Sequence, residues 1–448
     1  MYWDLAMKFV LSCYGTRGDA EPGAALACEL LRRGHDVSMA VAPDLVAFAE
    51  AAGIAAVAFG PDSETWLDVH RDFSGRLFRN PWKIRDLIAS GREDWEMLSQ
   101  CRIEAGTTLK SLAKGADLLL TGLLAEESAY NVAEFYDIPL AALHFGPVRA
   151  NGQTVPILPA AWERSATTAI EWLSWRLTKK LEDRQRHELA LPKADCPPPR
   201  RISESGSLEI QAYDGVWFPG LAAEWSKFGC RRPLVGTLTM ELPTDTDEEV
   251  ASWIAGGKPP IFFGFGSIPV KDAVETLAMI SAACAQLGER ALICSAATDF
   301  THVADWDHVK VVREVNYAAV FPACRAVVHH GGLGTTEAGL RAGAPTLMLW
   351  TWQDSAIRGR RLEQLTVGTA RRFSATTCES LIADLRAILT PQYVARARDI
   401  ATQMTKAAES VETAANLLER VASRVTPSPS DRSTSSEHRS SAWHRHAN

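Results

Sequence analysis

The chain alternates short apolar runs with amphipathic, helix-like stretches, and it does so in two successive series. Apolar runs of about four to eight residues, joined by helical crossovers, are typical of buried strands in a parallel sheet. The expected strands are residues 8–14, 36–42, 54–60, 117–122 and 139–145 in the first series, and 260–267, 290–296, 309–315, 326–332 and 345–350 in the second. The pattern therefore predicts an α/β fold built from two Rossmann-like halves.

At 448 residues, the chain is too long for one ordinary core and fits two domains of about 200 residues each. A stretch rich in proline and acidic residues at 233–249 separates the two series of strands. We therefore expect an N-terminal domain over 1–235 and a C-terminal domain over 236–425. The last expected helix, about 391–423, could pack back on the N-terminal domain, and the polar, Ser-rich residues 426–448 are expected to be disordered.

The composition excludes several classes of protein. A content of 46% hydrophobic and 23% charged residues is that of a globular protein, and the net charge of −7 gives no reason to expect nucleic acid as a partner. No apolar run reaches the ~18 residues of a membrane span, and the N-terminus shows no signal-peptide pattern. The nine cysteines are scattered without a C-x-x-C pair, which is typical of reduced thiols. We expect a cytoplasmic location.

The sequence HHGGLGTTEAGLRAGAP occupies residues 329–345, after a strand pattern and at the start of a helix pattern. Backbone N–H groups and the helix dipole at such a turn favour an anion, best a phosphate or diphosphate. His330 and Thr335 could donate further hydrogen bonds to it, while His329 would support packing or the turn. A metal site is less favoured because adjacent histidines at a strand end point to opposite faces. An ordinary Gly-rich turn remains a third interpretation.

Three other segments carry polar groups at expected strand ends. In GTRGDAEP, at 15–22, Asp19 could act as a base for a hydroxyl group or cap the N-terminus of a helix. Pro22 is expected in the first turn of that helix. FGFGSIP, at 263–269, brings small residues where a phosphate could approach the backbone. LWTWQDSAIRGRR, at 349–361, offers Asp354 to sugar hydroxyls, or else as an ordinary surface residue.

Together these segments resemble the GT-B-fold inverting glycosyltransferases that use nucleotide sugars, especially those acting on antibiotics, sterols and actinobacterial lipids. The resemblance covers most of the chain, from GTRGDAEPGAALACELLRRGHDVSMAVAP through LHFGPVRANG and FGFGS to the HHGG block, which is its most specific part. It implies two Rossmann-like domains facing a central cleft, with the acceptor bound by the N-terminal domain and the nucleotide sugar by the C-terminal domain.

The resemblance also implies roles for individual residues. Asp19 would be the general base, and no metal or other cofactor would be required. The expected donor contacts comprise a diphosphate set (His330, Gly332, Gly334, Thr335, Ser267 and Gly266), backbone groups near Val315 for the nucleobase, and Asp354 and Ser355 for the sugar. The acidic DTD at 245–247 resembles the metal-binding motif of another glycosyltransferase fold, but its Pro-bounded context favours a solvated linker.

The chain departs from the family pattern at the expected sugar end of the donor site. Ser355 replaces the Gln of an Asp-Gln pair, Ala356 replaces a Pro, and Arg358 stands where an aromatic residue is usual. The acidic residue often found at position 338 is Ala338 here, with Glu337 one position early. A nucleotide-sugar-binding homologue without transfer activity, and an epimerase or hydrolase on the same fold, therefore remain alternatives to a glycosyltransferase.

The acceptor is expected to be a hydrophobic natural product or a lipid. Trp66, Trp82 and His144 are the expected pocket residues, and Trp162 is a further expected apolar surface, within the walls formed by 62–113 and 144–175. The stretch SGRLFRNPWKIRDLIASGR, at 74–92, is basic and amphipathic. It is either a lid over the acceptor or a surface that makes peripheral contact with an anionic membrane.

Overall fold

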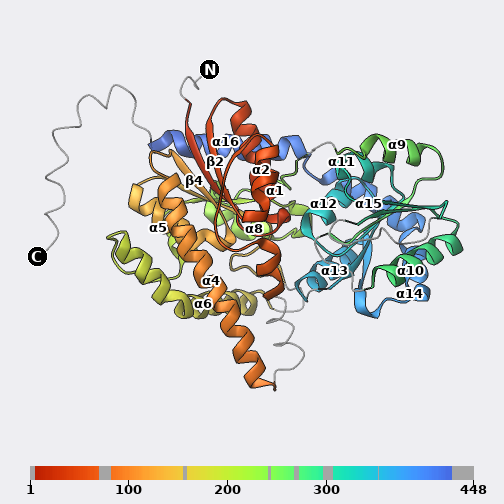
Figure 1. Ribbon diagram of the computed structural model, residues 1–448, viewed down its shortest axis with the longest axis horizontal. Helices are drawn as coiled ribbons and strands as arrows, with labels where there is room; N and C mark the ends of the chain where they lie inside the picture. The colour runs from red at the N-terminus through yellow and green to blue at the C-terminus, as the bar shows by residue number, and fades with distance from the viewer. Residues whose placement is uncertain are drawn as a thin grey trace, which may run out of the picture.

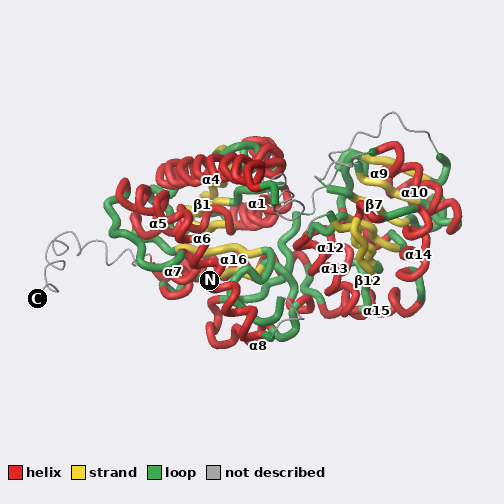
Figure 2. Tube along the Cα trace, turned by 90° about the horizontal axis from the view of Figure 1, so that it is seen from below, coloured by secondary structure: helices red, strands yellow, loops and turns green. Residues whose placement is uncertain are grey.

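A computed structural model gives the structure of the protein, which is described here over residues 6–69, 82–154, 159–240, 244–266, 272–295, 306–351 and 353–425. Two lobes lie side by side, each with a parallel sheet between layers of helices (Figures 1 and 2). Parallel strands are covered on both faces by their crossover helices, which explains why most of the strands are continuously apolar. The α/β class expected from the sequence is confirmed.

The N-terminal sheet has the strand order β3-β2-β1-β4-β5-β6, and every pair is parallel. Its strands are β1 (Lys8–Ser12), β2 (Asp36–Val41), β3 (Ala55–Ala58), β4 (Leu118–Gly122), β5 (Leu140–His144) and β6 (Leu208–Gln211). The first five were predicted. The sixth was not, because it is only four residues long and two of them, Glu209 and Gln211, are polar although they are buried.

The C-terminal sheet repeats this arrangement, with the order β12-β11-β10-β7-β8-β9. Its strands are β7 (Ile261–Gly264), β8 (Ala291–Cys294), β9 (Val309–Val312), β10 (Ala326–His329), β11 (Thr346–Trp350) and β12 (Gly368–Arg372). The sequence GTARR of β12 was not predicted, because an edge strand that ends in two arginines lacks an apolar run. The carboxyl ends of β7 and β10, which are neighbours, bring the two Gly-rich turns together.

The helices of the N-terminal half are α1 (Arg17–Arg32), α2 (Val46–Ala51), a helical segment at 63–69, α4 (Ile84–Leu112), α5 (Glu126–Tyr136), α6 (Ala160–Glu188), α7 (Pro198–Glu204) and α8 (Leu221–Trp225). Those of the C-terminal half are α9 (Asp247–Ala255), α10 (Ala273–Leu287), α11 (Tyr317–Val320), α12 (Leu333–Arg341), α13 (Gln353–Leu365), α14 (Cys378–Ile388), α15 (Pro391–Gln403) and α16 (Ala407–Val425). Pro22 lies in the second turn of α1, not in the first as expected, because the helix begins at Arg17. No described helix is both long and apolar enough to cross a bilayer.

The single long helix expected at 391–423 is wrong, because the chain breaks after α15. Met404 adopts an extended conformation, and the next helix, α16, runs across the N-terminal lobe (Figure 1). There α16 packs against α1 and contributes Leu418 to the N-terminal core. Its Glu419 carboxylate binds the side chains of Arg33 and His35 at 2.7 and 2.9 Å. The break therefore lets the end of the chain tie the two lobes together.

Asp214, which follows β6, is a second tie between the lobes. It is 4% exposed, and its carboxylate accepts hydrogen bonds from the N–H groups of Val216 at 3.1 Å and Thr405 at 2.7 Å. Its own N–H group donates to the Glu337 carboxylate of α12 at 3.3 Å. Trp217, three residues later, is buried in a cluster with C-terminal side chains such as Leu340. One N-terminal loop is thus fixed to both α12 and the α15–α16 break.

Replacing Asp214 with alanine should destabilise this junction. The N–H groups of Val216 and Thr405 would lose their acceptor, at a cost of about 1–3 kcal/mol for each buried group left unpaired. We expect a lower midpoint in urea unfolding followed by circular dichroism, with Asp214→Asn between the wild type and Asp214→Ala. Asp245→Ala, at an exposed site, is the control. Equal midpoints for the two alanine variants would contradict the role given to Asp214.

Candidate functional site

The centre of the site is the His330 ring, which lies between two Gly-rich turns. Gly266 follows β7 with φ +59°, and a methyl group there would lie 2.4 Å from Cε1 of His330. A methyl group on Gly332 would lie 2.8 Å from Nε2 of the same ring. Only glycine allows the backbone to come this close on both sides. The structure therefore brings together His330, Gly266 and Gly332, three of the residues expected to bind a diphosphate.

The N-terminus of α12 opens directly beside this ring. Its N-cap is Gly332, which has no side chain to accept hydrogen bonds from the first turn. The Thr336 N–H and hydroxyl groups both bond to the Gly332 carbonyl, at 3.0 and 2.7 Å. Gly334 has open space where a side chain would stand. The first N–H groups of the helix are left without intrahelical partners, so this end of α12 favours an anion.

The two histidines have different environments. His329 is fully buried, and its Nδ1 accepts a hydrogen bond from the Gly331 N–H group at 2.9 Å, which confirms that it supports the turn. Burial lowers the pKa of His330 to about 4, and the Arg358 guanidinium acts in the same direction. A hydrogen bond to the Gly264 backbone opposes this shift, but His330 stays neutral at pH 7 and carries a single ring N–H. The two rings meet edge to face, with centroids 6.4 Å apart.

We assigned Arg358 no role from the sequence. It was noted only because it stands where the family usually has an aromatic residue. From α13 its Nε donates to the Gly331 carbonyl at 3.2 Å, and its Nη2 donates to the Ser355 hydroxyl at 2.8 Å. Ser355 is 3% exposed and lies against Gly331. Ser355 therefore supports the turn and the guanidinium in this structure, rather than facing a sugar. Arg358 thus adds a cation beside Gly331, at the turn expected to bind a diphosphate, and the sequence motif did not reveal it.

Asp19 is the third residue of α1, beyond the end of β1. Its Oδ2 accepts hydrogen bonds from the Thr16 N–H group at 2.8 Å and from the Thr16 hydroxyl at 3.0 Å. Burial raises its pKa above the usual value of an aspartate, while these hydrogen bonds oppose the shift. A methyl group on Gly15 would lie 2.4 Å from Oδ2, so the carboxylate packs on the backbone of that residue. Asp19 thus caps α1 through Oδ2, and a base function would fall to Oδ1.

The start of α1 faces the C-terminal lobe across the interdomain region. Arg17 reaches Glu314 across the lobes, with 3.7 Å between Nη1 and Oε2. Tyr317, which follows Glu314 in the next helix, hydrogen-bonds with Thr335 of α12. Burial raises the pKa of Tyr317 well above its usual value, and Glu21 and Arg17 of α1 are among the charges that act on its hydroxyl. The Asp19 turn and the first turn of α12 therefore lie on opposite sides of one interdomain region.

The structure describes only some of the other residues that we expect to contact the nucleotide sugar. The Val315 side chain is 8% exposed and lies in the C-terminal core, so only its backbone is left for a nucleobase, as expected. Thr335 uses its side chain toward Tyr317, and its N–H group lies in the first turn of α12. Ser267 and the side chain of Asp354 lie outside the described part of the chain. Glu337 is fully buried toward Asp214 and does not stand in for an acidic residue at 338.

The three expected acceptor residues lie in different environments. Trp66 is partly buried and meets Tyr14 edge to face, with centroids 6.5 Å apart, close to the end of β1 and hence to Asp19. Trp82 is 70% exposed, and residues 74–81 of the basic amphipathic segment lie outside the described residues. His144 is 1% exposed, and its two ring nitrogens bond to Glu126 at 2.6 Å and Gln211 at 3.1 Å. We therefore leave His144 out of the acceptor site.

His144 instead belongs to a buried network of charges at the carboxyl edge of the N-terminal sheet. Arg149 binds Glu126 at 2.9 Å and Glu209 at 2.5 Å, and Arg232 binds Glu209 at 2.8 Å. Burial lowers the pKa of His144, and Arg149 adds to that shift, so the ring is neutral at pH 7. A histidine whose ring nitrogens are both bonded within the domain stabilises the fold and has no ring nitrogen left for a ligand.

The acidic DTD segment lies at the end of the interdomain linker and the start of α9. Asp247 begins α9, and its carboxylate accepts hydrogen bonds from the N–H groups of Thr244 at 2.8 Å and Asn316 at 3.2 Å. Among the described residues, no three His, Cys, Asp or Glu side chains are grouped as ligands of one ion. The segment thus joins the interdomain linker to the loop after β9.

Two family models match the chain. Residues 9–122 match the glycosyltransferase family 28 N-terminal domain, and residues 282–420 match the C-terminal domain of erythromycin biosynthesis protein CIII-like sequences. An uncharacterized glycosyltransferase of Mycobacterium tuberculosis is 58% identical, over 94% of this chain and 100% of its own length.

Solved structures of glycosyltransferases share the fold. The glycotransferase of kitacinnamycin superposes with a TM-score of 0.68 at 15% identity, covering 93% of this chain and 99% of that one. The glycosyltransferase VinC in complex with DTDP gives a TM-score of 0.61 at 18% identity, over 93% of this chain and 100% of its own. At these identities the likeness establishes the architecture alone.

Replacing Gly266 with alanine should displace the His330 ring, because the added methyl group would lie 2.4 Å from Cε1. We expect calorimetric titration with UDP and TDP to show at least about tenfold weaker binding, from the loss of one or more hydrogen bonds to phosphate. Gly288→Ala is the matched control, since Gly288 has a similar φ of +65° but no atom within 4 Å of the added methyl group. Equal affinities in both variants would show that the ring is not part of the diphosphate site.

Proposed function

Because the chain belongs to the GT-B glycosyltransferases of the antibiotic type, we propose that it transfers a sugar from a nucleoside diphosphate sugar to a hydroxyl group of a hydrophobic natural product or lipid, with inversion at the anomeric carbon. The observation that carries this proposal is the arrangement of Asp19 and the α12 N-terminus on opposite sides of one interdomain region. An acceptor hydroxyl and a leaving diphosphate need such an arrangement, with the reacting sugar between them.

In the acceptor half, Asp19 is the general base that takes the proton of the attacking hydroxyl. Its raised pKa makes it a stronger base than an exposed aspartate, and Thr16 holds the carboxylate in place through Oδ2. Tyr14 and Trp66 add aromatic surface near the same strand end, which supports a hydrophobic acceptor.

In the donor half, charge develops on the diphosphate as the bond to the sugar breaks. The free N–H groups at the start of α12 and the neutral His330 ring are placed to stabilise that charge through hydrogen bonds. Neither group is a full cation at pH 7, so the Arg358 guanidinium beside Gly331 supplies the formal positive charge. Backbone groups near Val315 receive the nucleobase, and Asp354 and Ser267 complete the donor contacts. This set of donors transfers the sugar without a metal.

A second candidate function is binding or hydrolysis of a nucleotide sugar without transfer. It is motivated by Ser355, whose hydroxyl is buried and bonded to Arg358, where relatives of the family carry a Gln that contacts the sugar. Incubation with a panel of nucleotide sugars and acceptors separates the possibilities. Nucleoside diphosphate release that requires acceptor supports transfer, release without acceptor supports hydrolysis, and tight binding without release supports the inactive homologue.

Asp19→Asn should abolish transfer while leaving nucleoside diphosphate affinity unchanged. Asparagine keeps an oxygen to accept from Thr16, so α1 stays capped while the base is lost. We expect the rate of sugar transfer to fall at least about a hundredfold. In the wild type, the rate should fall with decreasing pH as Asp19 is protonated, at a pKa above 3.8. Full activity in the variant would refute the base assignment.

Arg358→Met should weaken nucleoside diphosphate binding by about ten- to a hundredfold, which is the range expected for hydrogen bonds to a charged group. The loss should be smaller at high salt, because a screened guanidinium contributes less. The same variant should raise the pKa of His330 above about 4, since the guanidinium lowers it in the wild type. A histidine NMR titration measures this shift without any substrate. Unchanged affinity together with an unchanged titration would remove Arg358 from the site.

A further inference from the structure

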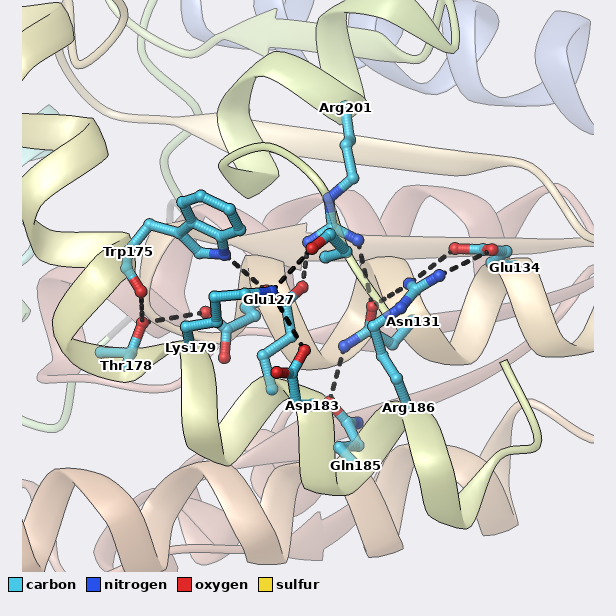
Figure 3. Close-up of polar contacts among 12 residues, drawn as sticks. Glu127, Asn131, Glu134, Trp175, Thr178, Lys179, Asp183, Gln185, Arg186 and Arg201 are labelled. Carbon is cyan, nitrogen blue, oxygen red and sulfur yellow. Dashed lines mark hydrogen bonds and ion pairs between the residues drawn. The ribbon is translucent and has the colours of Figure 1, made fainter. Parts of the chain in front are cut away.

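Helix α6 differs from an ordinary surface helix, because the face that it turns toward the protein is polar. Trp175 donates from its indole nitrogen to Glu182 at 2.7 Å, and Glu182 pairs with Arg201 of α7 (Figure 3). Arg186 binds Asn131 and Glu134 of α5 at 2.7 and 2.8 Å. These side chains of α6 are all buried. Where a surface helix normally buries an apolar stripe, α6 is held by hydrogen bonds and ion pairs.

The outer face of α6 is apolar and exposed. Trp162 is 73% exposed, Ile170 64%, Leu173 57% and Leu177 66%. Their spacing of three, four and eight residues places them on one side of the helix, about 20 Å long, together with the exposed Ala166. Single exposed apolar residues are common, but a continuous stripe of large ones on one helix marks an interaction surface.

The same face becomes basic toward the C-terminal end of the helix. Lys180 and Arg184 follow Leu177 by three and seven residues and are exposed. Arg176, also exposed, lies over the Trp172 ring at 5.6 Å. The only carboxylate of α6 exposed near these cations is Glu188, which pairs with Arg184 at 3.1 Å. An apolar stripe that continues into cations matches the boundary between acyl chains and anionic headgroups.

We propose that the outer face of α6, defined by Trp162, Ile170, Leu173, Leu177, Lys180 and Arg184, docks the protein on the surface of an anionic membrane. The apolar residues enter the boundary between headgroups and acyl chains, and the two cations bind lipid phosphates. The inner network keeps α6 rigid, so that its outer face is presented without unfolding. Helix α4 packs against α6 on the same lobe. The docking does not depend on which sugar or acceptor the enzyme uses.

Co-sedimentation with vesicles tests this inference without donor or acceptor. We expect the wild type to sediment with vesicles of phosphatidylcholine mixed with phosphatidylglycerol, and more weakly with phosphatidylcholine alone. Leu173→Glu/Leu177→Glu should lower the vesicle partition coefficient at least about tenfold, because each side chain buries apolar area in the bilayer. Lys180→Glu/Arg184→Glu should abolish the preference for the anionic vesicles.

The matched control is Ser165→Glu/Thr168→Glu, which adds the same charge to exposed positions on the other side of the same helix. Circular dichroism and the thermal midpoint verify that each variant folds. The inference is overturned if the wild type sediments with neither vesicle or if the control loses binding as the leucine variant does. It is also overturned if sedimentation equilibrium shows a dimer that Leu173→Glu/Leu177→Glu dissociates, because the stripe would then bind a second copy of the chain.

Discussion

The buried carboxylate of Asp214 connects the two lobes, each of which carries one half of the proposed site. It holds the loop after β6, the break between α15 and α16 and, through its own N–H group, α12. The proposed base lies on one sheet and the proposed diphosphate turn on the other, so neither lobe contains a complete site. The position of Asp19 relative to His330 therefore depends on junctions of this kind, together with the pairing of Glu419 on α16 with Arg33 and His35.

Burial sets the electrostatics of the donor side. A histidine at a diphosphate site suggests a cation, but the pKa of about 4 leaves His330 neutral at pH 7. In the proposed mechanism, stabilisation of the leaving diphosphate then rests on oriented N–H groups, the dipole of α12 and the guanidinium of Arg358. Arg358 also holds the carbonyl of Gly331, so one side chain both shapes the turn and charges it. The position that departs from the family pattern thus becomes part of the diphosphate site in our proposal.

Buried charge also shapes the N-terminal lobe. The carboxyl edge of its sheet carries Glu126, Arg149 and Glu209 in direct contact, and α6 adds Glu182 and Arg186 on its inner face. Such networks require every member to be paired, so they fix the orientation of the helices that carry them. For α6 the consequence is that Trp162, Ile170, Leu173 and Leu177 point outward, which is the basis of the membrane surface proposed above.

The sequence alone determined the α/β class, ten of the twelve strands in the described part of the chain and the turns at Asp19 and His330, because those features depend on local periodicity and on glycine at strand ends. Its periodicity failed at β6, where polar residues are buried, at β12, an edge strand that ends in two arginines, and at the α15–α16 break, where a distant carboxylate binds the chain. Only the tertiary structure decided that His144 and Ser355 are enclosed by hydrogen bonds, that Arg358 reaches the Gly331 carbonyl and that α6 turns an apolar stripe outward. Each of these depends on which side chains distant segments bring to the same place, and a local pattern of residues does not encode that.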